Sequence, residues 1–78
     1  MIAVKELIEV IAKSLVKHPD QVSVTAAADK GVTVYELRVA PEDMGKVIGK
    51  QGRIAKAMRT VVKAAATRDN QRIMVEII

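Results

Sequence analysis

The residues of this chain that could do chemistry are concentrated in one short segment, VIGKQGR at Val47–Arg53. Its two glycines, Gly49 and Gly52, would let the backbone approach a ligand closely, because glycine carries no side chain. Lys50 and Arg53 add two positive charges. A helix that begins directly after the second glycine would add unpaired N–H groups and the positive end of its dipole. The segment therefore predicts a site for a bound anion.

The basic residues of the chain are gathered around this segment. Seven of its 13 Lys and Arg residues, and none of its 9 Asp and Glu residues, lie between positions 46 and 68. The formal charge of the whole chain is +4, so this stretch supplies all of the positive excess. A charge run is often only the solvated face of a helix. Its coincidence with the glycine pair favours anion binding instead. The seven residues are Lys46, Lys50, Arg53, Lys56, Arg59, Lys63 and Arg68.

Two common nucleotide-binding motifs do not fit. A Walker A loop reads G-x-x-x-x-G-K-[ST]. The stretch from Gly45 to Lys50 is one residue too short and is followed by Gln51 in place of a hydroxyl residue. The dinucleotide signature G-x-G-x-x-G is absent as well. A polyanion with regularly spaced phosphates, such as a nucleic acid strand, fits a basic helix face of this length better.

Other chemistries lack the residues they need. The chain has no cysteine, which excludes disulfides and thiolate metal sites. The single histidine, His18, is interpreted as a cation at a helix end, beside Pro19. Glu42 and Asp43 are adjacent, so they do not face each other as an acid–base pair would, and they are interpreted as charges in the first turn of a helix. We predict no catalytic residues, no metal site and no cofactor.

Length and composition agree with one small domain. A chain of 78 residues with 50% hydrophobic and 28% charged residues is typical of a globular fold. Tyr35 is the only aromatic residue, which speaks against base-stacking platforms that need several rings. The sequence has no signal-peptide pattern and no apolar run near the roughly 20 residues of a membrane helix. We therefore expect a cytoplasmic protein.

Hydrophobic periodicity predicts six elements in the order α-β-β-α-α-β. Pro19 is expected to end the first helix. The two helices between the second and third strands permit those strands to pair in parallel. This order predicts an α+β fold with a three-stranded mixed sheet and three helices on one face. The predicted elements are a helix at 2–17, strands at 22–28 and 32–39, a short helix from Pro41, a helix at 53–67 and a strand at 72–78. The apolar stripe predicted for the long helix is Ile54, Ala57, Met58, Val61, Val62 and Ala65.

The sequence from Ile48 to Gly52, placed between two helices, resembles the G-x-x-G loop of the KH domain. In that family the loop clamps the backbone of about four nucleotides. The element order resembles the type II arrangement, and the chain is similar to single-KH bacterial RNA-binding proteins of the KhpA family over residues 1–78. The resemblance implies one KH domain that binds single-stranded RNA. The implied RNA-binding residues are Lys46, Ile48, Gly49, Lys50, Gln51, Gly52, Arg53, Lys56 and Arg59.

The resemblance also implies partners. Members of that family are regarded as cytoplasmic RNA chaperones that associate with themselves and with a larger KH-containing protein, and they are linked to cell shape. The sequence adds that Val10, Met74 and Ile78 lie off the predicted inward stripes, which favours a homodimer. The alternative function is a KH-fold adaptor that acts through protein contacts. No membrane partner is expected.

Overall fold

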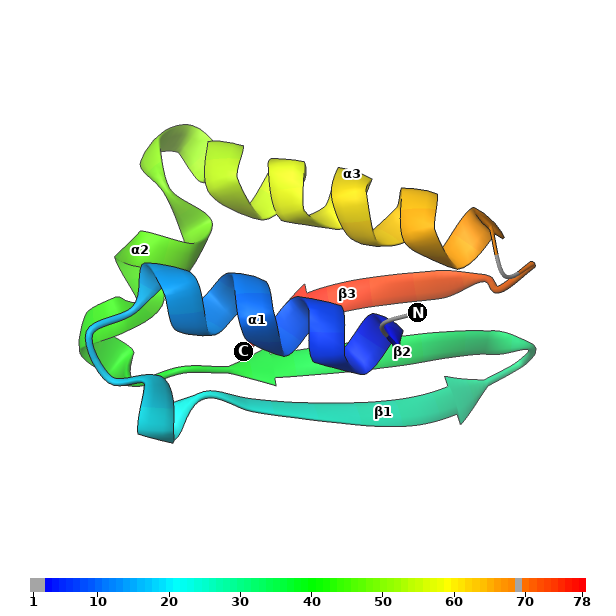
Figure 1. Ribbon diagram of the computed structural model, residues 1–78, viewed down its shortest axis with the longest axis horizontal. Coiled ribbons are helices and arrows are strands. Elements are labelled where there is room, and N and C mark those ends of the chain that lie inside the picture. The colour runs from blue at the N-terminus through cyan, green and yellow to red at the C-terminus, as the bar shows by residue number, and fades with distance from the viewer. Residues whose placement is uncertain (1–2, 69) are drawn as a thin grey trace.

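The computed structural model describes residues 3–68 and 70–78, and within them it confirms the α-β-β-α-α-β order (Figure 1). Single 3₁₀ turns precede β1 and α2 and fill the segment between α2 and α3. The helices are α1 (Val4–Leu15), α2 (Met44–Ile48) and α3 (Arg53–Arg68). The strands are β1 (Ser23–Asp29), β2 (Val32–Arg38) and β3 (Ile73–Ile77).

The three strands form one mixed sheet in the order β1-β2-β3. β1 and β2 are antiparallel and are joined by Lys30 and Gly31, both with positive φ, as in the tight turns that match the twist of a hairpin. β3 pairs in parallel with β2 after the crossover through α2 and α3. Figure 1 shows α1 and α3 side by side over one face of the sheet, with α2 at one end. The predicted α+β fold is confirmed.

The hydrophobic core lies between the sheet and the two long helices. Alternation along the strands directs Tyr35, Leu37 and Val75 to the helices, where they are buried with Ile8 and Val62. The opposite face of the sheet has no helix over it, and Met74 there is 51% exposed. The fold thus has one layer of helices and one open sheet face.

Two details differ from the sequence prediction. α1 ends at Leu15, before the turn at Pro19, because the next residues are extended and bond to a side chain elsewhere. The first predicted position, residue 2, lies outside the described residues, as does residue 69 of the last loop. The buried stripe of α3 is rotated relative to the prediction: it consists of Ala55, Met58, Val62 and Ala66. Apolar residues occupy more than half of this helix surface, so their spacing did not fix which side is buried.

Candidate nucleic-acid interface

The G-x-x-G segment forms a sharp turn between α2 and α3. Gly49 has φ 76° and ψ 175°, a conformation essentially restricted to glycine. Gln51 and Gly52 follow with φ of 57° and 73°. The backbone N–H of Gly49 donates to the carbonyl of Gly45, and that of Gly52 donates to the carbonyl of Gly49. The chain therefore reverses direction within three residues and enters α3 at Arg53.

The turn is held against the start of α3 by Ile54. A Cβ atom placed on Gly49 would lie 2.5 Å from Cγ1 and 2.9 Å from Cβ of Ile54. Real Cβ atoms do not come that close to other carbon atoms, and the Cβ of Ile54 is fixed by its own backbone. Position 49 thus requires glycine for two reasons, the backbone conformation and the space that the side chain of Ile54 occupies.

The side chains predicted to bind RNA surround this turn. The exposed ones are Lys50, Gln51, Arg53, Lys56 and Arg59. Lys46, Ile48, Gly49 and Gly52 are half-buried in the same region of the chain. The neighbouring Val47 is completely buried in the core. Ile48 and Ile54 keep accessible surface on either side of the turn.

α3 has two differently composed sides that flank its buried stripe. Lys56, Arg59 and Lys63 are spaced by three and four residues, so they share one side, which we term the basic side. The Nε of Arg59 donates a hydrogen bond of 3.2 Å to the carbonyl of Val75, so this side lies next to β3. Ile54 and Val61, seven residues apart, share the other side and face α1. The helix thus separates the three charges of the basic side from its exposed apolar residues, and Arg68 alone lies on the same side as Val61.

Asp43 lies in the first turn after Pro41, as the sequence predicted, and its side chain has a further role that the sequence did not predict. Its side chain is 1% exposed and accepts hydrogen bonds from the backbone N–H groups of Lys17 and His18, and it lies 3.0 Å from Nδ1 of His18. Burial raises the pKa of Asp43, but the hydrogen bonds from Lys17 and His18 outweigh it and lower the pKa below its usual 3.8. Asp43 ties the segment after α1 to the turn that opens α2. His18 is its partner and lies beyond the end of α1 at Leu15.

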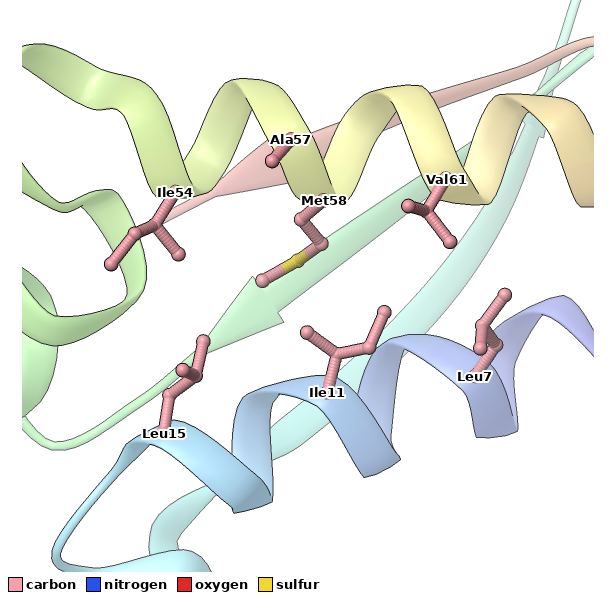
Figure 2. Close-up of a pocket in the computed structure, with 7 residues that line it drawn as sticks. All are labelled: Leu7, Ile11, Leu15, Ile54, Ala57, Met58 and Val61. Carbon is pink, nitrogen blue, oxygen red and sulfur yellow. The ribbon is translucent and has the colours of Figure 1, made fainter.

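A second surface feature lies between the two long helices. An open groove of about 430 Å³ separates α1 from α3, and Figure 2 shows its apolar side chains pointing into it from both helices. Within residues 3–68 and 70–78, no charged side chain lines it. Ile54 stands at one end of this groove, so the same side chain borders both the groove and Gly49. The lining residues are Leu7, Ile11, Leu15, Ile54, Ala57, Met58 and Val61.

Comparison with known proteins gives the family. A family model described as the KH domain of KhpA and KhpB matches residues 5–77. This chain belongs to the KhpA/KhpB KH-domain family. The resemblance noted from the sequence is confirmed over nearly its full length. The KhpA/KhpB match describes a KH-domain family and not an enzyme family, as expected from the sequence.

Several curated proteins of the KhpA/KhpB family are similar over almost the whole chain. The RNA-binding protein KhpA of Clostridium acetobutylicum is 64% identical over 74 residues, which cover 95% of this chain and 99% of that one. KhpA of Clostridium perfringens is 62% identical over 74 residues, with the same coverage. KhpA of Aquifex aeolicus is 46% identical over 78 residues, which cover 100% of this chain and 99% of that one.

Two solved structures of Era share the fold. Era of Aquifex aeolicus bound to GDP and aluminium fluoride gives a TM-score of 0.69 at 17% identity, and it covers 95% of this chain but 29% of the Era chain. Era in complex with a nucleotide and a fragment of 16S ribosomal RNA gives a TM-score of 0.64 at 16% identity, covering 95% of this chain and 28% of that one. At these identities the likeness concerns the fold of this KhpA/KhpB-family chain and nothing further.

The described residues contain neither a membrane-spanning helix nor a cluster of metal ligands. Among residues 3–68 and 70–78, every helix is too short or too polar to span a lipid bilayer. In the same part of the chain, no three His, Cys, Asp or Glu side chains are grouped as metal ligands would be.

Proposed function

We propose that this chain binds single-stranded RNA through the G-x-x-G turn, the first turn of α3, and Lys56 and Arg59 on the basic side of that helix. The observation that carries the proposal is the position of Lys50 and Arg53, both exposed, at the sharp turn where α3 begins. The first N–H groups of a helix have no partner within it and point toward an approaching phosphate. Similar proteins named as RNA-binding support the proposal.

The test replaces the two exposed residues inside the turn. Lys50→Asp combined with Gln51→Asp places carboxylates where a phosphate must approach, while surface changes of this kind alter stability by about 0.5 kcal/mol or less. We expect RNA binding to be lost and the circular dichroism spectrum to be unchanged. Lys5→Asp with Gln21→Asp is the control, because both positions are exposed, lie elsewhere and change the charge equally. Equal loss of affinity in both double variants would mean that net charge alone determines RNA affinity, which would contradict the proposal.

A second candidate function, protein interaction, is favoured by the groove between α1 and α3. The proposed occupant is a second copy of this chain, as the family resemblance also implies. Val10 and Val61, 53% and 51% exposed, lie on the same two helices and supply apolar surface for such a contact. The groove is uncharged, so two chains that each carry +4 can meet there without bringing like charges together.

A homodimer would present two RNA-binding turns on one particle, which raises avidity for a long RNA. That property suits an RNA chaperone in the cytoplasm, the role implied by the resemblance. A larger KH-containing protein would be an alternative occupant of the same groove. In both cases the apolar side of α3 makes the protein contact and the basic side remains open to RNA.

A further inference from the structure

The basic side of α3 extends beyond Arg59, the last residue that the sequence implied in RNA binding. Lys63 lies one helical turn beyond Arg59 on that side and is exposed. Among the described residues, no carboxylate lies within ion-pair distance of its ammonium group. It is ten residues after Arg53, which at 1.5 Å per residue places it about 15 Å along the helix from the turn.

Arg59 shows which way this side faces. Its hydrogen bond to the carbonyl of Val75 places the middle of the basic side beside β3, so Lys56 and Lys63 continue the same side before and after it. Arg68 does not belong to this row, because it lies seven residues after Val61 and shares the side that faces α1. A row of three positive charges therefore runs along α3, away from the turn, from Lys56 through Arg59 to Lys63.

We propose that bound RNA continues from the clamp along this row, and that Lys63 contacts a phosphate outside the clamped nucleotides. The inference rests on the proposed RNA-binding function. Lys63 lies four residues beyond Arg59, the last residue assigned to the clamp, which is about 6 Å along the helix. A stacked strand advances about 3.4 Å per nucleotide, so this distance corresponds to roughly two further nucleotides. A four-nucleotide RNA held at the clamp does not reach Lys63, whereas an eight-nucleotide RNA does. The site is thus a phosphate-binding row that extends beyond the four clamped nucleotides.

The test compares Lys63→Gln with Arg68→Gln and the wild-type chain on RNAs of four, six and eight nucleotides. Both variants lose one exposed charge from the second half of the same helix, on different sides. The measured quantity is the ratio of each variant's Kd to that of wild type at each RNA length. A longer RNA offers more binding registers, which lower the Kd of wild type and variant alike. Taking the ratio cancels this effect.

For Lys63→Gln we expect a ratio near one with four nucleotides and about two to five with eight, the size of one exposed charge contact. The salt dependence of binding to the longer RNA should also become shallower, by about 0.7 in the log–log slope. Arg68→Gln should give a ratio near one at every length. A ratio for Lys63→Gln that is the same at all lengths would overturn the inference. Failure of the proposed function itself is distinct, because the wild-type chain would then bind none of these RNAs.

Discussion

The side chain of Ile54 fills the space where a side chain on Gly49 would project, with Cγ1 of Ile54 2.5 Å from that position. This contact fixes the position of α3 relative to α2, because Gly49 directly follows α2 and Ile54 lies in the first turn of α3. The two glycines of the turn are therefore not equivalent. Around a Cβ atom built on Gly52, which also has positive φ, there is no described atom within 4 Å.

Alanine substitutions at three glycines should follow this difference. Gly49→Ala combines backbone strain with a steric clash and should lower the free energy of unfolding by about 2–4 kcal/mol. Gly52→Ala meets only the backbone strain, about 1–2 kcal/mol. Gly45→Ala lies in α2 with open space around it and should be neutral or stabilising by up to about 1 kcal/mol. Urea unfolding measures all three, and equal values for Gly49→Ala and Gly52→Ala would contradict the role given to Ile54.

The buried carboxylate of Asp43 should make stability depend on pH in the acid range. Its pKa is lowered in the folded chain, so its stabilising effect is fully present above the usual 3.8 and is lost as the pH falls through the lowered value. We expect the free energy of unfolding to decrease as the pH falls below about 4 for this reason. Urea titrations at a series of pH values measure the effect.

Asp43→Asn isolates this contribution from that of the other carboxylates. The amide keeps the shape of the side chain but cannot accept all three hydrogen bonds as a carboxylate does, so the variant should be less stable than wild type at neutral pH. The difference between the two proteins should shrink as the pH drops below 4. A difference that stays constant over this range would show that ionisation of Asp43 contributes nothing.

RNA binding should weaken with salt to a predictable degree. A single strand loses affinity with a log–log slope of about −0.7 for each phosphate that the protein neutralises. With about four basic groups near the turn, we expect a slope of roughly −2 to −3 for a short RNA. Fluorescence anisotropy at several salt concentrations gives this slope. A slope of zero would exclude phosphate contacts from Lys50 and Arg53.

Self-association should depend on the groove and not on the open sheet face. Val61 and Met74 are both 51% exposed, the first beside the groove and the second on the opposite face of the molecule. Val61→Glu should yield a monomer by light scattering at micromolar to millimolar concentration, while Met74→Glu should remain dimeric. The reverse result would place the contact on the sheet, and a monomeric wild-type chain would contradict self-association altogether.

Most of the fold followed from local patterns. The turn at Lys30 and Gly31 and the alternation of Tyr35 and Leu37 are fixed by short-range preferences, so the hairpin and its buried face were predictable. The glycine pair likewise marked the turn, because the conformation of Gly49 is one that few other residues adopt. The exposure of Val10, Met74 and Ile78 was predicted correctly too.

The remaining features depend on contacts between distant residues. The pairing of Asp43 with His18 joins positions 25 residues apart, and no local pattern distinguishes it from an ordinary charge at a helix start. The end of α1 at Leu15 depends on the same contact. The rotation of α3 escaped prediction because its many alanines fit a buried or an exposed position equally well, and this rotation is what opens the groove at Val61.

The most direct test of the RNA-binding interface is an amide NMR titration of the isotope-labelled chain with a short single-stranded RNA. We predict that the largest shift changes occur from Gly49 to Lys56 and extend along the basic side of α3 to Arg59. Thr25 and Val34, on the open sheet face, and Leu7, in the groove, should change little at low protein concentration. Shift changes centred on the open sheet face, with the Gly49–Lys56 segment unaffected, would contradict the proposed interface.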